Sequence, residues 1–179
     1  MTHYIYIPGL GDHFDPLRRL ALLRWKVGAK VTFVPMTWND RSETFEQKYE
    51  RIVRAIDGAD GEIVLVGESA GGAMALLTFS RQLERVSRVV TICGYNHGAE
   101  SVHPYHKRAH PAFYNLMPVV DTLTLDGKRI TTIYSTHDHV VTPQHSRLSG
   151  ATEKVLHSPG HLTTIARVLL SRIGVNNTL

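Results

Sequence analysis

The sequence predicts one α/β domain over residues 1–179, with a mostly parallel sheet of six strands and helices on both faces. Two observations predict this fold. Short β-branched runs alternate with longer segments of helical period, an order typical of parallel strands joined by helices. Several runs are also nearly continuous in apolar character, as expected of strands that are covered on both faces. No internal repeat, low-complexity tract or linker divides the chain.

Six runs are predicted to form the strands, because they are rich in the residues that favour extended structure. In chain order they are 3–9 (HYIYIPG), 30–35 (KVTFVP), 62–67 (EIVLVG), 88–94 (RVVTICG), 129–136 (RITTIYST) and 153–158 (EKVLHS). In an open parallel sheet, ligands bind outside the carboxyl ends of the strands. The residues that directly follow each run are therefore the first candidates for a functional site.

Four segments between the runs have helical period: 15–26, 42–57, 70–83 and 161–174. The first has Asp15 as its predicted N-cap and Pro16 at its first helical position. The aromatic residues on these helical faces are predicted to lie in the core, and they are Trp25, Phe45, Tyr49 and Phe79. The 95–118 segment contains three prolines and four histidines. It is predicted to form a loop with a short helix over the edge of the sheet, in contact with the substrate.

The charge distribution does not favour a nucleic-acid partner. The net charge is +4, but the basic residues are scattered among acidic ones and form no dense run. The single cysteine, Cys93, lies in an apolar run, which predicts a buried thiol and excludes an internal disulfide. No leader peptide is expected, because the first 13 residues lack a basic segment followed by a long apolar one, and no apolar stretch is long enough to cross a bilayer. The expected location is the cytoplasm, without a membrane partner.

The stretch 65–72, LVGESAGG, places a serine between glycines where an apolar run ends and a helical pattern begins. The glycines could simply relieve crowding in an ordinary turn. A sharp strand-to-helix turn that exposes a nucleophile also requires small residues two positions before and after the serine. Gly67 and Gly71 occupy those positions, and Gly72 would relieve the packing of the helix on the sheet. The pattern predicts Ser69 as a nucleophile.

A serine hydroxyl needs a base within hydrogen-bond reach, and the base needs a group that fixes its tautomer. Two residues after later strands could supply them: His161 as general base and then acid, and Asp138 as the orienting carboxylate. His157 is an alternative base, but it lies inside a strand run, which favours a structural role. Asp121 and Asp126 are alternative carboxylates. Both precede the strand at 129–136, which places them at the opposite end of the sheet.

The negative charge that develops on the substrate oxygen needs fixed hydrogen-bond donors. The backbone N–H of Ala70 is one candidate, because amides at the start of a helix have no partner within the helix. The second is expected in the loop after the first strand, from the N–H of Leu10 or else of Gly11. Gly11 and Glu68 are also predicted to contact the substrate. For Glu68, which precedes the nucleophile, a solvent-facing position is an equal alternative.

These motifs resemble the α/β-hydrolase family over nearly the whole chain. GESAG matches the family's G-x-S-x-G turn, and the chain order Ser69, Asp138, His161 matches its order of serine, acid and histidine. PGL at 8–10 occupies the position of the family's oxyanion loop. The chain departs from the family in having Pro8 where many members have histidine, in lacking HGGG, and in lacking a large cap before Asp138. The resemblance implies an α/β-hydrolase fold with a minimal cap, similar to small lidless bacterial lipases and esterases.

The expected function is that of a serine hydrolase acting on a small-molecule carboxylic ester or thioester through an acyl-enzyme intermediate. An amide- or peptide-cleaving hydrolase and a non-catalytic binding protein of the same fold are the alternatives. No organic cofactor or metal is expected. The histidines at 97, 103, 106, 110, 137 and 139 lie in loop-like sequence, with no HExxH helix and no cysteine partner beside them.

Overall fold

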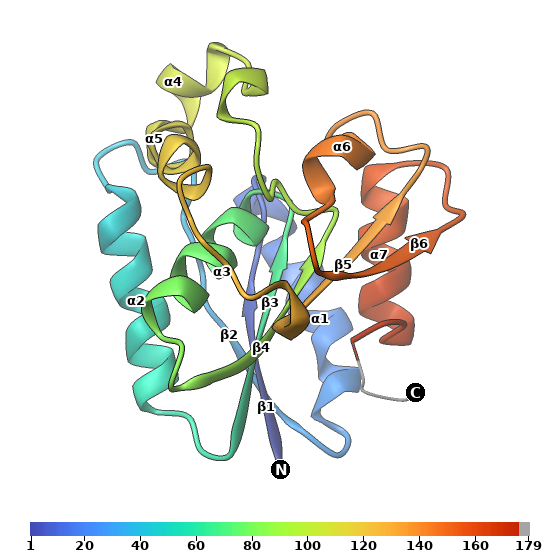
Figure 1. Ribbon diagram of the computed structural model, residues 1–179. Helices are drawn as coiled ribbons and strands as arrows, with labels where there is room; N and C mark the ends of the chain where they lie inside the picture. The colour runs from blue at the N-terminus through green and yellow to red at the C-terminus, as the bar shows by residue number, and fades with distance from the viewer. Residues whose placement is uncertain (176–179) are drawn as a thin grey trace.

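A computed structural model describes residues 1–175 and contains one six-stranded sheet with the strand order β2-β1-β3-β4-β5-β6 (Figure 1). All five pairings between neighbouring strands are parallel. The strands are β1 (Thr2–Ile7), β2 (Lys30–Phe33), β3 (Glu62–Glu68), β4 (Val86–Ile92), β5 (Ile130–Ser135) and β6 (Thr152–Leu156). Each of the six predicted runs is therefore a strand, and the parallel sheet is confirmed.

The register of the sheet brings the ends of several strands to one edge. Ile7 of β1 pairs with Gly67 of β3, and Glu68 pairs with Ile92 of β4. Ile92 in turn pairs with Ile133 of β5. The loops that leave β1, β3, β4 and β5 consequently begin side by side, as the crossover connections of a parallel sheet require.

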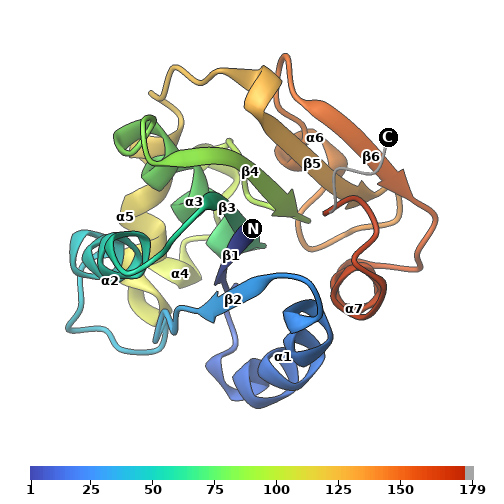
Figure 2. The ribbon, with the colours of Figure 1, turned by 90° about the horizontal axis from the view of Figure 1, so that it is seen from below.

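Helices cover both faces of the sheet (Figure 2). One face packs against α2 (Phe45–Asp57), α3 (Ala70–Arg81) and α5 (Pro111–Val120), and the other packs against α1 (Asp15–Leu22) and α7 (His161–Ser171). Along β3 the side chains of Ile63 and Leu65 enter the first core, whereas those of Val64 and Val66 enter the second. Because both alternating sets are buried, the strands are apolar without a period of two.

The predicted core aromatics lie where expected. Trp25 and Phe79 are fully buried, Tyr49 is buried, and Phe45 is partly buried against the same core as Tyr49. Trp25 also donates a hydrogen bond from Nε1 to the carbonyl of Leu169, at 2.7 Å, and so ties the segment that follows α1 to α7.

Two predicted helix starts are wrong. The N-cap of α1 is Phe14 rather than Asp15, which lies in the first turn and accepts a hydrogen bond from Arg18 at 2.8 Å. Helix α2 begins at Phe45 rather than at residue 42, because Thr44 and Gln47 form a capping box that fixes its first turn. The helices at 70–81 and 161–171 begin as predicted and end two or three residues earlier.

The 95–118 segment is more helical than predicted. It forms a 3-10 turn (Ala99–Ser101), α4 (Tyr105–Ala109) and most of α5, which rise above the carboxyl ends of the strands in Figure 1. Pro111 lies at the start of α5, where its missing N–H removes no helical bond. Helix α5 buries Phe113, Leu116 and Met117 in the core that it shares with α2 and α3. Tertiary packing therefore stabilises a helix that contains a proline, Pro118, in its interior.

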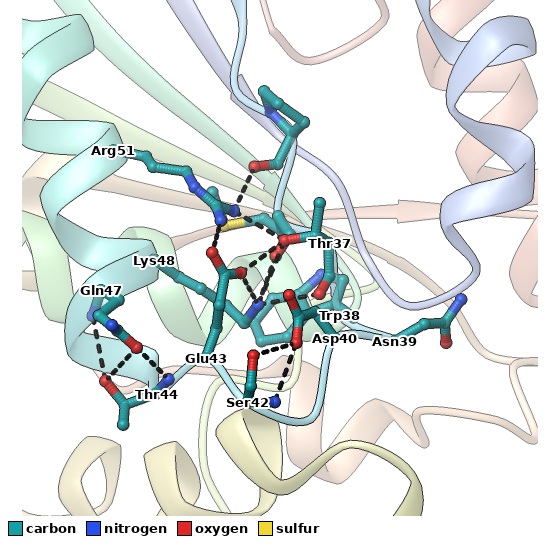
Figure 3. Close-up of polar contacts among 12 residues, drawn as sticks. Thr37, Trp38, Asn39, Asp40, Ser42, Glu43, Thr44, Gln47, Lys48 and Arg51 are labelled. Carbon is teal, nitrogen blue, oxygen red and sulfur yellow. Dashed lines mark hydrogen bonds and ion pairs between the residues drawn. The ribbon is translucent and has the colours of Figure 1, made fainter.

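A buried ionic cluster holds the loop between β2 and α2 (Figure 3). The ammonium of Lys48 is fully buried and donates to the carbonyls of Met36 and Thr37, at 2.7 and 2.9 Å, and to Glu43 at 2.8 Å. Arg51 pairs with the other oxygen of Glu43. The three hydrogen-bond donors of the buried ammonium thus all have acceptors, as a buried charge requires.

No helix within residues 1–175 combines the length and the apolar character needed to cross a bilayer.

Candidate active site

Ser69 lies on a strained turn between β3 and α3. Its backbone angles are φ 50° and ψ −122°, a conformation that non-glycine residues rarely adopt. The turn is fixed from the β4 side: the N–H of Ser69 donates to the carbonyl of Ile92, and its carbonyl accepts from the N–H of Tyr95, both at 3.0 Å. These bonds hold the strained backbone and fix the position of the Ser69 side chain at the carboxyl edge of the sheet.

The glycines around Ser69 are required by close approaches of the backbone. A Cβ atom on Gly67 would lie 2.3 Å from the carbonyl oxygen of Gly71. One on Gly71 would lie 2.2 Å from the carbonyl oxygen of Ile7, and one on Gly72 would lie 2.8 Å from Cα of Gly94. All three distances are too short for a real side chain, so the predicted close approach of positions 67 and 71 is present.

Asp138 and His161 are hydrogen-bonded to each other. Nδ1 of His161, at the start of α7, lies 2.7 Å from Oδ2 of Asp138, in the turn after β5. Oδ1 of the same carboxylate accepts from the N–H groups of Val140 and Val141, at 2.9 and 3.0 Å. Burial raises the pKa of Asp138, but the hydrogen bond and charge of His161 and the two backbone donors outweigh it, so that the pKa is lowered overall. Asp138 is therefore a buried carboxylate in which both oxygens accept from fixed donors.

Ser69 and His161 line the same pocket, which has a volume of about 400 Å³. Ala70 and Leu10 contribute to its wall, and Val141 connects it to Asp138. The hydrogen bonds of residues 1–175 include none between the Ser69 hydroxyl and His161. Since Nδ1 of His161 is occupied by Asp138, Nε2 is the nitrogen that remains for a reacting group.

The loop after β1 lies against the nucleophile turn and is held by several polar contacts. A Cβ atom on Gly9 would lie 2.7 Å from Cβ of Ser69, so the two segments are in direct contact. The carbonyl of Pro8 accepts from Nε1 of Trp38 at 2.9 Å. Asp12 accepts from the backbone N–H groups of Trp38 and Asn39, both at 3.0 Å. The loop is thereby anchored to the segment that Lys48 and Glu43 hold in place.

The other side of this loop is held by a buried ion pair. Arg18 donates to the carbonyls of Leu10 and Gly11, at 3.1 and 2.9 Å, and its Nη2 lies 2.5 Å from Oε1 of Glu68. The same oxygen of Glu68 accepts from the N–H of Gly9 at 3.3 Å. The carbonyls of two successive peptide units, Leu10–Gly11 and Gly11–Asp12, therefore point toward Arg18.

The N–H groups of Leu10 and Ala70 are the two amides predicted to bind the oxyanion. The turn and loop hydrogen bonds of residues 1–175 include none donated by either amide. Ala70 is the first residue of the 12-residue helix α3, and both residues line the pocket that contains Ser69. Two donors without protein partners next to the hydroxyl of Ser69 are suited to a negatively charged oxygen.

Glu68 does not face solvent, so that alternative is wrong. Its side chain is fully buried because it ends the central strand β3 and lies beneath the loop after β1. The hydroxyl of Tyr6 donates to its second carboxylate oxygen. Burial, followed by the charge of Glu68 and this hydrogen bond, raises the pKa of Tyr6 well above its usual value. Substrate contact by Glu68 and Gly11 remains a prediction, and the contacts of Glu68 within the protein indicate a positioning role.

The residues considered as alternatives to His161 and Asp138 do not line the pocket that contains Ser69. His157 is exposed and follows β6 instead of lying within it, since the strand ends at Leu156. Asp121 accepts from the N–H groups of Gly98 and Ala99, both at 2.8 Å. Asp126 caps the 3-10 turn (Gly127–Arg129) that precedes β5.

A metal does not fit the one cluster of possible ligands found within residues 1–175. Ligand atoms of Cys93, Asp138 and His161 lie within 4.8 Å of one another. Asp138 and His161 are already hydrogen-bonded to each other, and burial and the charge of Asp138 raise the pKa of the Cys93 thiol. The carboxylate and the imidazole that a metal would need are therefore already engaged with each other.

Several pocket residues were not identified from the sequence. Arg18 was assigned only to a helix, and Tyr95, His103, His106 and Phe113 only to the irregular segment. The burial of Arg18 has no signal in the local sequence, because its partner Glu68 is distant along the chain.

Comparison with known proteins identifies the fold. No protein-family model matches the sequence, and no curated protein matches it either. Among solved structures, a monoacylglycerol lipase from Paleococcus ferrophilus is 13% identical with a TM-score of 0.68, and the alignment covers 94% of each chain. A meta-cleavage product hydrolase from Pseudomonas fluorescens is 16% identical with a TM-score of 0.67, and the alignment covers 99% of this chain and 92% of that one.

The bottromycin epimerase BotH is also similar, with 16% identity and a TM-score of 0.67 over 97% of this chain and 90% of that one. The chain thus has the α/β-hydrolase fold that its motifs predicted. The three similar proteins differ in activity, so the reaction has to be argued from the site.

Proposed function

We propose that this protein is a serine hydrolase that cleaves a carboxylic ester or thioester of a small molecule through an acyl-enzyme intermediate. The observation that carries the proposal is the 2.7 Å hydrogen bond between His161 and Asp138, in a pocket that also contains Ser69 on its strained turn. The lipase and the hydrolase among the similar structures are consistent with it.

In the proposed reaction, Oγ of Ser69 attacks the carbonyl carbon while Nε2 of His161 takes the hydroxyl proton. Asp138 holds the imidazole by Nδ1 and stabilises its cationic form. The N–H groups of Leu10 and Ala70 bind the oxyanion of the tetrahedral intermediate. His161 then returns the proton to the leaving alcohol or thiol. In the second half, His161 activates water, which releases the acid and regenerates Ser69.

The proposal needs no cofactor, because protein groups fill each role. The reaction requires Oγ of Ser69 and Nε2 of His161 to come within hydrogen-bond reach, since the bond between them is absent among the hydrogen bonds of residues 1–175. Catalytic hydrogen bonds of this kind often tighten only when a substrate binds.

A fluorophosphonate probe tests the nucleophile, because only an activated serine reacts with it. Labelling and hydrolysis of 4-nitrophenyl acetate are compared for the wild type, Ser69→Ala and Ser101→Ala. Ser101 lines the same pocket but donates its hydroxyl proton to the carbonyl of Gly98, so it is a matched control. We expect Ser69→Ala to lose labelling and to lower kcat about 10⁴- to 10⁶-fold. Labelling that persists without Ser69 would refute the assignment.

Amide or peptide cleavage would use the same groups, and a non-catalytic binding protein would use none of them. Turnover of 4-nitroanilides, measured beside that of esters and thioesters, distinguishes amide cleavage from ester cleavage. A wild-type protein that is not labelled by the probe and turns over no substrate supports a non-catalytic binding protein.

A further inference from the structure

An apolar groove lies between α1 and α7, the two helices that cover one face of the sheet. Its volume is about 740 Å³. Three of the leucines that line it are unusually accessible: Leu17 is 64% exposed, Leu20 is 64% exposed and Leu162 is 59% exposed. Single exposed leucines are common, but a contiguous group of them marks a binding surface.

Both helices direct a regular apolar stripe toward the groove. Helix α7 contributes Leu162, Ile165, Ala166, Leu169 and Leu170, which follow the spacing of one helical face. Ile165 and Leu169 are buried, whereas Leu162 and Leu170 extend the stripe beyond the core into solvent. The spacing from Leu162 to Leu170 corresponds to a groove about 12 Å long. Because Leu162 and Leu170 are not buried in the core, their side chains are available to contact a ligand.

The groove adjoins the candidate catalytic pocket. Arg18, Glu68, Leu162 and Ile165 line both cavities. Arg18 and Glu68 are buried, and their charges are paired with each other. Leu162, which follows His161 in α7, is the exposed member of the four, so its side chain is the surface over which a ligand would pass from one cavity to the other.

We infer that the groove binds an unbranched aliphatic chain, the acyl group of the ester, with its carbonyl at Ser69; this inference rests on the proposed function. A groove about 12 Å long accommodates roughly ten carbons of an extended chain. An extended hydrocarbon matches an apolar groove that adjoins the pocket of Ser69. The lining residues that the two cavities share favour this occupant over a second copy of the chain, because a chain attached to the reacting carbonyl must lie next to that pocket.

The test compares kcat/KM for 4-nitrophenyl acetate, hexanoate and decanoate, all below the concentration at which the esters aggregate. We expect the wild type to prefer decanoate to acetate by about 30-fold or more, because each buried methylene contributes to binding. The double variant Leu20→Gln/Leu170→Gln should lower the ratio of the two values about tenfold or more. Both leucines are more than half exposed, so the variant is expected to fold. Leu83→Gln is the control, because Leu83 is 48% exposed but lies outside the groove.

The outcomes separate this inference from the proposed function. Hydrolysis of acetate with no preference for decanoate overturns the groove and leaves the serine hydrolase intact. A second readout does not depend on turnover: calorimetric binding of sodium decanoate to the Ser69→Ala protein should weaken at least tenfold when the two leucines are also replaced. Equal binding by both proteins, or none, overturns the inference. The inference is also overturned if the wild type is a dimer and the leucine substitutions convert it to a monomer. A second copy of the chain would then occupy the groove.

Discussion

The guanidinium of Arg18 lies 2.5 Å from the carboxylate of Glu68, and both side chains are buried beneath the loop that carries Leu10. Arg18 also binds the carbonyls of Leu10 and Gly11, so one side chain sets the orientation of the two peptide units that follow the Leu10 N–H. The contact links the residue before the nucleophile to the proposed oxyanion donor. It makes the geometry of the site depend on a pair of charges that do not touch the reacting atoms.

Replacement of Arg18 by lysine should lower kcat more than it raises KM. Lysine keeps the positive charge beside Glu68, but an ammonium cannot reproduce the planar set of donors that reaches two carbonyls at once. We expect kcat on 4-nitrophenyl acetate to fall about tenfold, by analogy with a partly misplaced oxyanion donor. Arg54→Lys, at an exposed position of α2, is the control. An unchanged kcat in a folded Arg18→Lys protein contradicts the positioning role.

Replacement of Asp138 by asparagine should impair catalysis and leave the fold intact. The amide oxygen can still accept from Val140 and Val141, so the NH₂ group would then face Nδ1 of His161. Nδ1 of His161 would then have to accept a hydrogen bond, so the proton of the neutral imidazole would lie on Nε2. In that tautomer Nε2 cannot take the proton of the Ser69 hydroxyl. We expect kcat to fall about 10³- to 10⁴-fold with little change in melting temperature. Asp126→Asn, which affects only a cap, should retain activity.

Acid should destabilise the protein through Glu43. Burial raises the pKa of this carboxyl, but hydrogen bonds from Lys48, Thr37 and Arg51 outweigh it and lower the pKa to about 2 from 4.5. A lowered native pKa stabilises the fold above pH 4.5, and this contribution is lost as the pH falls from 4.5 toward about 2. Glu43→Gln should lower the free energy of unfolding at pH 7 by about 3 kcal/mol, since it leaves Lys48 buried without its counter-charge.

Urea unfolding at pH 7 and at pH 3 measures this contribution. The difference between wild type and Glu43→Gln should shrink at the lower pH, because at pH 3 the carboxyl is protonated in the unfolded chain while it is still mostly ionised in the folded protein. A difference that is the same at both pH values would mean that the charge of Glu43 does not stabilise the loop. Glu50→Gln, on the exposed face of α2, provides the matched control.

Replacement of Gly71 by alanine should disrupt the nucleophile turn. The new Cβ would lie 2.2 Å from the carbonyl oxygen of Ile7, which is backbone and cannot rotate away. We expect a loss of about 3 kcal/mol or more in stability, and a loss of fluorophosphonate labelling in any protein that folds. At Gly58 the nearest atom to a new Cβ is 3.5 Å away, so Gly58→Ala should be almost neutral. Equal effects of the two substitutions would exclude the close-approach explanation.

The sheet and the main helices could be predicted because their signals are local. Runs such as EIVLVG are apolar at every position, and β3 is indeed buried on both sides. The turn at Ser69 could also be predicted, because the glycines that it requires lie within three residues of the serine in the sequence. The proximity of Asp138 to His161 followed from the rule that parallel strands end at one edge, whereas the spatial order of the strands was not predicted.

What the sequence did not predict depends on contacts between distant segments. The burial of Glu68 requires Arg18 and Tyr6, which belong to other elements. Helix α5 forms despite Pro118, because packing against α2 and α3 outweighs its low helix propensity. The groove between α1 and α7 likewise arises only when two helices from opposite ends of the described chain lie side by side.

The position of His161 at the start of α7 affects when activity can appear during synthesis. The strands β1 to β4 and helices α2, α3 and α5 can bury most of one core before α7 has left the ribosome. A nascent chain at that stage would already present Ser69 on its turn, with no imidazole to activate it. On the proposed mechanism, the hydroxyl stays chemically inert until the last described helix docks.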